Sequence, residues 1–220
     1  MAEDQKELIR RIASVVGHEL RNPMAVINNS AYFVRAKLGG AGLDPKVEKH
    51  LKIIESEIAR ADKLIGDMLT FSRAYEPQIE TRPFDAVVGD AVAAYAAPEG
   101  GKIDAKLGAK DAAVKIDVKA FSDALKRLLD NAFSAQGDKG TVKLATGVDK
   151  SGVFVVVSDS GSGVDAKVKD TLFEPFVTTK PRGMGLGLSL ARKLLGAVGG
   201  AVSFESGPKG AAFKISLPKA

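Results

Sequence analysis

The fold is indicated most clearly where LFEPFVTTK (residues 172–180) is followed, two residues later, by GMGLGL (183–188). The glycine run predicts a loop that leads into a helix over 186–198. Glycines let the backbone approach a ligand closely, and the free amides of a helix N-terminus favour anions. The run is not a phosphate-binding P-loop, because no Gly-Lys-Ser/Thr follows it. It is not a dinucleotide-binding loop either, because no strand–helix–strand unit precedes it.

The segment before the glycine run contains residues suited to an anchored loop. Phe173 and Phe176 can hold a mobile segment against a core, while Thr178, Thr179 and Lys180 can contact phosphate. Considered alone, this segment fits an ordinary anchored loop equally well.

Two further features lie upstream. Asp159-Ser160-Gly161-Ser162-Gly163 follows the apolar strand expected over 153–157, and an acid with two alternate glycines makes a tight turn with exposed amides. A plain β-turn is the alternative. Asn131 lies in a helix expected over 118–135, and an amide oxygen can bind Mg²⁺ when phosphates supply the remaining ligands. For this residue a surface asparagine is the alternative.

The chain changes character near residue 75. Only five of its 23 glycines lie in residues 1–75, and that segment is typical of two long helices. Asp44-Pro45 predicts the start of the second helix, which should end between Ser72 and Tyr75. The first helix contains Pro23, which predicts a kink or a lost hydrogen bond near Glu19.

The second helix carries an apolar seam with alternating spacings of four and three residues. The seam consists of Val47, Leu51, Ile54, Ile58, Ala61, Ile65 and Met68. Two such helices in a hairpin cannot bury a full apolar stripe alone, so the pattern predicts a homodimer in which two hairpins form a four-helix bundle.

His18 is the most distinctive single residue of the first helix. Helical geometry points it away from the apolar seam, which is ordinary for an exposed histidine. Its neighbour Glu19 could serve as acid/base partner to a histidine nucleophile. His50 has no comparable setting and is interpreted as a surface or inter-helix residue.

The second segment reads as mixed α/β. We expect strands at Ala113–Ile116, Thr141–Ala145, Val153–Ser158, Ala201–Glu205 and Ala212–Leu217. We expect helices at Phe84–Tyr95, Val118–Ala135 and Leu186–Val198. Ser206–Gly210 predicts an antiparallel hairpin between the last two strands, and a helical layer on one face of a mixed sheet is the expected architecture.

Composition excludes several classes of protein. The chain of 220 residues is 45% hydrophobic and 27% charged, as in ordinary globular proteins, and it shows neither a membrane-spanning apolar run nor a signal peptide. It has no cysteine and two histidines, which excludes disulfides, thiolate chemistry and multi-histidine metal sites. The net charge of +5 is spread along the chain, so no nucleic-acid partner is expected.

Five segments occur in a defined order: His18–Pro23, Asn131, Asp159–Gly163, Phe173–Lys180 and Gly183–Leu188. In this order and spacing they resemble the H, N, G1, F and G2 boxes of two-component sensor histidine kinases, and the resemblance covers nearly the whole chain. Its short lid is similar to that of the nitrogen-regulatory branch.

The resemblance implies two domains and a reaction. Residues 1–75 would form the dimerisation and histidine-phosphotransfer domain, 76–82 a linker, and 83–220 an ATP-binding domain with the Bergerat (GHKL) fold, an α+β two-layer sandwich. His18 would attack the γ-phosphate of ATP, and Glu19 would take its proton. The phosphoryl group would then pass to an aspartate of a response regulator.

The resemblance also implies the binding residues. Asn131 would hold Mg²⁺, and Asp159 would accept a hydrogen bond from the adenine amino group. The pocket and lid would be formed by Gly161, Gly163, Thr178, Thr179, Lys180, Gly183, Gly185, Gly187 and Leu188.

The pattern Glu19-x-x-Asn22 resembles the family's phosphatase motif. Asn22 lies one turn past His18 on the same helix face, where its amide could orient water against a regulator's aspartyl phosphate. We therefore expect a kinase that also has phosphatase activity.

The N box departs from the family pattern. Arg127 replaces the asparagine usual one turn before the Mg²⁺ ligand, and Ser134 and Ala135 stand where a lysine is usual. Arg127 could bind phosphate directly or leave the affinity for ATP weak.

Two alternative functions remain open. One is a phosphotransfer protein whose ATP-binding domain no longer works, which the intact glycines disfavour. The other is a GHKL ATPase that drives a clamp, which His18-Glu19 and the heptad hairpin disfavour. Neither a sensor nor a receiver domain is visible in the sequence, so we expect a cytoplasmic chain whose membrane association, if any, depends on a sensor region outside it.

Overall fold

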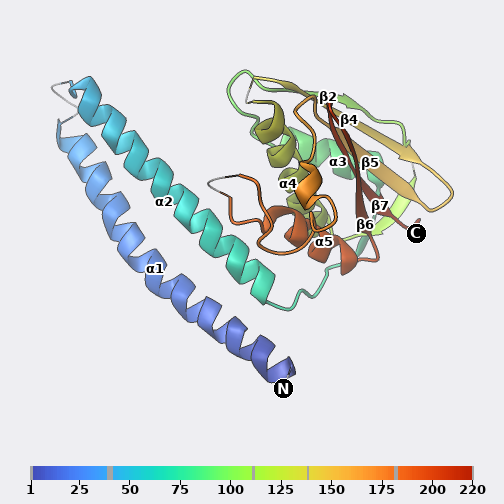
Figure 1. Cartoon of the computed structure of the whole chain (residues 1–220), viewed down its shortest axis with the longest axis horizontal. Helices are drawn as coiled ribbons and strands as arrows, with labels where there is room; N and C mark the ends of the chain where they lie inside the picture. Colours follow the sequence, from blue (N-terminus) through green and yellow to red (C-terminus); the bar gives the residue numbers. More distant parts are fainter. Residues whose placement is uncertain (1, 39–41, 111, 138, 181–182, 220) are drawn as a thin grey trace. The chain divides into compact units, whose positions relative to one another are not determined.

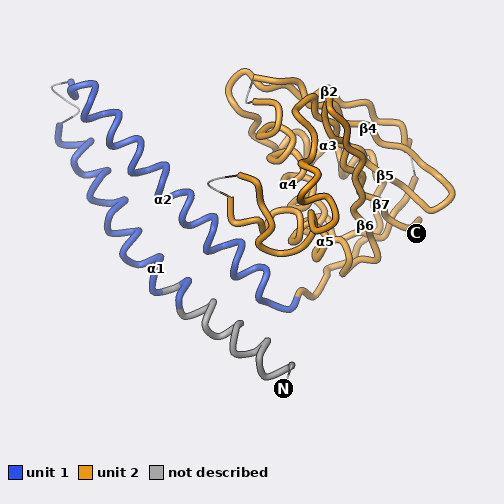
Figure 2. The backbone as a smooth tube through the Cα atoms, viewed as in Figure 1, with its two compact units in different colours: residues 1–74 blue, residues 75–220 orange. Residues whose placement is uncertain are grey.

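The computed structural model describes residues 2–38, 42–110, 112–137, 139–180 and 183–219; in the first helix, the side chains of residues 2–15 and of His18 lie outside this description. The chain divides into two compact units, residues 1–74 and residues 75–220 (Figure 2). Their assignment as a phosphotransfer domain, a linker at 76–82 and an ATP-binding domain stays a prediction.

The first unit is a hairpin of two long helices, α1 (Ala2–Leu38) and α2 (Pro45–Ser72) (Figure 1). The start of α2 is confirmed, because the Asp44 carboxylate caps the helix by accepting a hydrogen bond from the Lys46 amide at 2.7 Å. Its end at Ser72 also lies where the sequence predicts it. Helix α1 continues through Pro23 without interruption.

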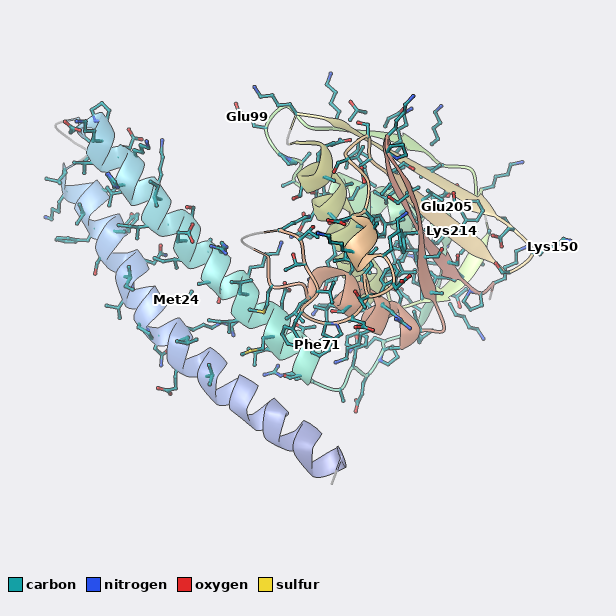
Figure 3. All side chains as sticks on the ribbon, viewed as in Figure 1. Met24, Phe71, Glu99, Lys150, Glu205 and Lys214 are labelled. Atoms are coloured by element: carbon teal, nitrogen blue, oxygen red, sulfur yellow. The ribbon has the colours of Figure 1, made fainter. Side chains whose placement is uncertain are left out.

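The two helices pack closely at their open end. Ile65 and Leu69 of α2 are buried there, and Met24 of α1 packs against them (Figure 3). A Cβ at Gly17 would lie 3.0 Å from side-chain atoms of both Ile65 and Leu69. Position 17 therefore has room for little more than a hydrogen atom at this packing distance. Ion pairs between Arg21 and Asp62 (2.7 Å) and between Arg35 and Glu55 (3.0 Å) also connect the helices.

The hairpin leaves much apolar surface uncovered within the chain. In α1 the exposed large apolar side chains that the structure describes are Val16, Leu20, Val26, Ile27, Tyr32, Phe33, Val34 and Leu38. In α2, Leu51 and Ile65 of the predicted seam are buried, whereas Val47 and Ile54 are each 39% exposed. Only part of the seam is therefore buried within the hairpin. The exposed part is expected of a surface that packs against a further partner.

The second unit is built on a five-stranded mixed sheet and a separate pair of strands. The order in the large sheet is β2-β4-β5-β7-β6, in which β2 and β4 are parallel and the other neighbours antiparallel. Its strands are β2 (Lys102–Lys106), β4 (Thr141–Val148), β5 (Val153–Ser158), β6 (Ala201–Gly207) and β7 (Gly210–Leu217). The small pair consists of β1 (Glu80–Pro83) and β3 (Ala113–Ile116). The predicted hairpin is confirmed, with Gly207 paired to Gly210 across its turn.

Three helices cover one face of the large sheet (Figure 1). They are α3 (Phe84–Ala93), α4 (Val118–Gln136) and α5 (Gly187–Gly196), accompanied by a short 3-10 turn at Ala166–Val168. One continuous core joins the helices to alternate residues of β4, β5 and β7. The expected helical layer on a mixed sheet is confirmed. Among the residues that the structure describes, no helix is both long enough and apolar enough to span a bilayer.

The sequence analysis missed two strands, β1 and β2. Strand β2 is an edge strand whose only large apolar side chain is Ile103, and β1 consists of Glu-Thr-Arg-Pro. β1 has no alternation of apolar and polar residues. In β2 the alternation Lys-Ile-Asp-Ala-Lys spans five residues with one large apolar side chain, which is too weak a signal for a half-buried strand. Backbone hydrogen bonds pair β1 with β3 and β2 with β4.

Hydrogen bonds to Asp117 connect the start of the second unit to helix α4. Its Oδ1 accepts a hydrogen bond from the Ala120 amide at 2.9 Å, which caps α4. Its Oδ2 accepts from the Tyr75 hydroxyl at 2.8 Å and from the Gln78 amide at 2.6 Å. Burial favours a raised pKa for the carboxyl, but these hydrogen bonds together outweigh it and lower the pKa of Asp117. Burial, and then Asp117, raise the pKa of Tyr75 to about 12.

Replacing Asp117 with asparagine should destabilise the second unit. Asparagine has a single side-chain oxygen, so it could not accept from the Ala120 amide and from the Tyr75 and Gln78 donors together. Each donor left without an acceptor would cost up to about 1–3 kcal/mol. We expect urea unfolding, followed by circular dichroism at pH 7, to show a loss of roughly 2–4 kcal/mol.

This difference should depend on pH. A carboxyl whose pKa is lower in the folded chain stabilises fully above its unfolded pKa, near 4, and loses that contribution as the pH falls through the folded pKa. The gap between wild type and Asp117→Asn should therefore shrink below about pH 4. The matched control is Asp44→Asn, an exposed cap that asparagine can replace. Equal losses at both caps would contradict the role assigned to Asp117.

Candidate functional site

Asp159 directly follows β5, and only one of its two carboxylate oxygens accepts hydrogen bonds from the described residues. Its side chain is buried, and Oδ1 accepts from the backbone amides of Gly161 (2.9 Å) and Ala211 (3.3 Å). Oδ2 is buried and has no hydrogen-bond partner among the described residues. Because a buried carboxylate oxygen without a donor is costly, this atom is suited to a donor supplied by a ligand.

The turn after Asp159 sits directly on the last turn of α4. A Cβ at Gly161 would lie 2.5 Å from the carbonyl oxygen of Ala135, so a side chain there would force the two segments apart. The Gln136 side-chain oxygen accepts hydrogen bonds from the amide (3.0 Å) and the hydroxyl (3.1 Å) of Ser160. The turn and the helix are thus joined by a close backbone approach and two hydrogen bonds.

Gly163 continues this turn toward the β6–β7 hairpin. It has a positive φ of 75°, and a Cβ there would collide with the backbone of Gly207. The next amide, that of Val164, donates to the Ser206 hydroxyl at 2.7 Å. Beside this contact lies a shallow cavity of about 390 Å³, lined by Ser158, Asp159, Glu205, Ser206, Gly207, Gly210, Ala211 and Ala212.

Asn131 and Lys180 meet although 49 positions separate them in the chain. The Lys180 ammonium group donates to the side-chain oxygen of Asn131 at 2.8 Å. Among the described residues, no cluster of three or more histidine, aspartate or glutamate side chains could hold a metal ion. A divalent cation at Asn131 would therefore need most of its ligands from a bound molecule and water.

The segment between the two glycine turns is anchored at its start and exposed further on. Phe173 packs edge-on against Phe204 of β6, with ring centroids 5.9 Å apart. Phe176 is 64% exposed and has a positive φ of 67°, which is unusual for a bulky residue. Thr178 and Thr179 are exposed, and the Thr178 hydroxyl oxygen accepts from the Lys180 amide at 3.0 Å.

The second glycine run closes this segment at its base. The Phe176 amide donates to the Gly185 carbonyl at 3.1 Å, and Gly185 has a positive φ of 70°. The Gly183 amide donates to the Lys180 carbonyl at 3.0 Å. Gly187 begins α5 with open space beside it, and Leu188 packs against the core.

The predicted phosphotransfer residues belong to the first unit. His18, Glu19 and Asn22 all lie in α1; Glu19 and Asn22 are exposed, and the His18 side chain lies outside the described residues. His50 is exposed on α2, as predicted.

Sequence reasoning missed two contributors to the site of the second unit. One is Gln136, whose only signal was a polar residue in the last turn of an apolar helix. The other is Tyr95, which stacks on Phe133 at 6.0 Å and donates to Asp130, beside Asn131, at 3.0 Å. Burial, and then Asp130, raise the pKa of Tyr95, so its hydroxyl remains a donor.

Two family descriptions match the chain. Residues 8–76 match the His Kinase A (phospho-acceptor) domain, and residues 116–220 match the histidine kinase-, DNA gyrase B- and HSP90-like ATPase. The first match spans most of the first unit, and the second spans residues 116–220 of the second unit.

Curated relatives are sensor and sporulation kinases. Sporulation kinase A of Bacillus subtilis is 27% identical over 100% of this chain and 36% of its own length. Sensor protein FixL of Bradyrhizobium diazoefficiens is 31% identical over 95% of this chain and 43% of its own length. The chain thus spans less than half the length of these relatives.

Solved histidine kinase structures share the fold. Full-length ShkA in complex with AMPPNP covers 96% of this chain and is matched over 46% of its own, with a TM-score of 0.77 and 23% identity. The histidine kinase ThkA in complex with the response regulator TrrA covers 99% of this chain and is matched over 64% of its own, with a TM-score of 0.70 and 23% identity.

A test of the glycine contact is the substitution Gly185→Ala. A Cβ at this position would lie 2.6 Å from backbone atoms of Phe176 and Val177, and the positive φ disfavours any L-residue. We expect the 176–177 backbone to shift and nucleotide binding to weaken about tenfold, because such strain costs on the order of 1–3 kcal/mol. Calorimetric titration and thermal unfolding measure the two effects.

The control is Gly196→Ala at the end of α5, where no atom would lie within 4 Å of the new Cβ. This variant should unfold at or above the wild-type temperature. Wild-type binding by Gly185→Ala would rule out a tight contact at this point.

Proposed function

Because this chain belongs to the sensor histidine kinases, with their phosphoacceptor domain followed by their ATPase domain, we propose that it phosphorylates itself on His18 with ATP. The phosphoryl group then passes to an aspartate of a response regulator. In this reaction a nitrogen of the His18 ring attacks the γ-phosphorus of ATP, the bond to the β-phosphate oxygen breaks, and ADP leaves. Glu19 takes the proton of the attacking imidazole.

The observation that carries the proposal is the unpartnered Oδ2 of Asp159. A buried acceptor at the end of a core strand suits the exocyclic amino group of adenine, which is a donor. Guanine carries a carbonyl at the same position, which would face the carboxylate without a proton between them.

The contact between Asn131 and Lys180 supports the proposal that the phosphates of the nucleotide bind at this end of the site. An ammonium group on the Asn131 oxygen indicates that this oxygen is suited to a cation, so Asn131 would be a Mg²⁺ ligand together with phosphate oxygens. When bound, Mg²⁺ would neutralise charge that develops on the phosphates. Lys180, with Thr178 and Thr179, would then turn to the phosphates.

The glycine turns support a pocket that closes around the nucleotide. Gly161 and Gly163 keep the base turn close to α4 and to the β6–β7 hairpin. Gly183, Gly185 and Gly187 would shape the lid, and Leu188 holds the following helix to the core. Arg127 lies half-buried on α4 one turn before Asn131, where it would substitute for the family's asparagine by contacting phosphate.

The exposed apolar surface of the hairpin supports the two proposed partners, a second copy of the chain and a response regulator. Val16, Leu20, Ile27 and Val34 follow one another along α1 in steps of four or seven residues, which suits packing against a second hairpin in a homodimer. Another side of α1 carries Asn22 and further exposed apolar groups, including Val26 and Phe33. This side suits the docking of a response regulator.

The kinase proposal is tested by incubating the chain with γ-labelled ATP and Mg²⁺. We expect acid-labile, base-stable label on wild type and none on His18→Gln, because a phosphoramidate needs the ring nitrogen. The matched control is His50→Gln, which changes the only other histidine and should keep the label. ATP hydrolysis without any protein label would instead favour a clamp-type ATPase.

We also propose that Asn22 gives the chain phosphatase activity toward the phosphorylated regulator, because its exposed amide lies one turn after His18. The variant Asn22→Ala should autophosphorylate at the wild-type rate and remove the regulator's phosphate more slowly, by about tenfold or more. Asn29→Ala, an exposed asparagine on the same helix, is the control. Equal loss of both activities in Asn22→Ala would defeat this role.

A further inference from the structure

Gln136 connects the two ends of the proposed nucleotide site. We propose that Gln136 is a positioning residue that sets the preference of the site for adenine, by holding the Asp159–Gly161 turn on the last turn of α4. This inference rests on the proposed ATP-binding function and adds a residue that determines base specificity.

Gln136 holds Ser160 through two hydrogen bonds. Its single side-chain oxygen accepts from both the amide and the hydroxyl of Ser160, at 3.0 and 3.1 Å. Ser160 stands between Asp159 and Gly161, so the two bonds fix the centre of the turn. A rotation of the turn about the end of β5 would break both of them.

Gln136 has little freedom to follow such a rotation. On its other side it lies against Gly140, where a Cβ would come within 2.6 Å of the Gln136 Cδ. Its Nε2 is buried and has no hydrogen-bond partner among the described residues. The cost of that buried donor indicates that the conformation is kept for the contact made by the oxygen at the other end of the amide.

The turn controls the position of the Asp159 carboxylate. Asp159 Oδ1 accepts from Gly161 N at 2.9 Å, so the position of Oδ2 depends on the turn. Selection between adenine and guanine by one carboxylate oxygen requires that the oxygen cannot move away from a mismatched carbonyl. If Ser160 were released, Asp159 could swing toward water and the penalty against guanine would fall.

Gln136 lies on the same helix, α4, as Asn131. It lies five residues after Asn131, which corresponds to about 7.5 Å along the helix. One rigid helix therefore carries the proposed cation ligand and the support of the base turn. Gln136 would thereby set the spacing between the base end and the phosphate end of the nucleotide.

The test compares the dissociation constants of ATP and GTP, measured by calorimetry with Mg²⁺ on the full chain. Wild type should prefer ATP. Gln136→Met keeps the length of the side chain but removes the acceptor, and it should lower the GTP-to-ATP ratio of dissociation constants about tenfold. Gln136→Glu retains an acceptor for Ser160 and should keep most of the wild-type ratio. Gln78→Met, an exposed glutamine outside the site, is the control for the added thioether.

A purely structural role for Gln136 predicts a different result. It would weaken both nucleotides equally in Gln136→Met, and an unchanged ratio would overturn the inference. If this variant does not fold, Ser160→Ala decides, because it removes one of the two bonds at an exposed residue. It should lower the ratio about threefold, and a wild-type ratio would overturn the inference. Absence of binding of either nucleotide to wild type would overturn the proposed function instead.

Discussion

The burial of one face of helix α4 is the constraint on which the second unit depends. Phe121, Leu125, Leu128 and Leu129 are each at most 1% exposed, and they join α4 to the sheet in a single core. Because this face cannot rotate without exposing large apolar groups, the polar residues on the rest of the helix have fixed directions. The packing of α4 therefore fixes the directions of Asn131 and Gln136.

Two loops far apart in sequence depend on the same helix. The turn after β5 approaches the backbone of Ala135 closely, and Lys180, in the segment before the second glycine run, donates a hydrogen bond to Asn131. At its other end the Asp117 cap ties α4 to Tyr75, the first residue of the unit. A change in α4 would therefore reach the base turn, the lid and the chain that leads in from the hairpin.

The two units differ in how far they satisfy their own apolar surface. The second unit closes a continuous core with helices on one side of a sheet. In the hairpin, the described cluster around Ile65 and Leu69 is small, and large apolar groups such as Val26 and Phe33 are 65% and 60% exposed. The physical reason is that two helices alone enclose too little volume to cover both of their apolar stripes.

Local chemistry in the sequence determined the helices and most strands, and it indicated the residues of the candidate site. Asp44-Pro45 marks a helix start, Val153–Ser158 reads as a buried strand, and the glycine runs mark turns, because each depends on neighbouring residues alone. Strands β1 and β2 could not be read, since they contain at most one large apolar side chain each and are defined by backbone pairing with another strand. Only the tertiary structure brought Lys180 to Asn131 and Gln136 to Ser160, and left Asp159 Oδ2 buried without a donor. Contacts of this kind are set by how the core packs, which no local pattern encodes.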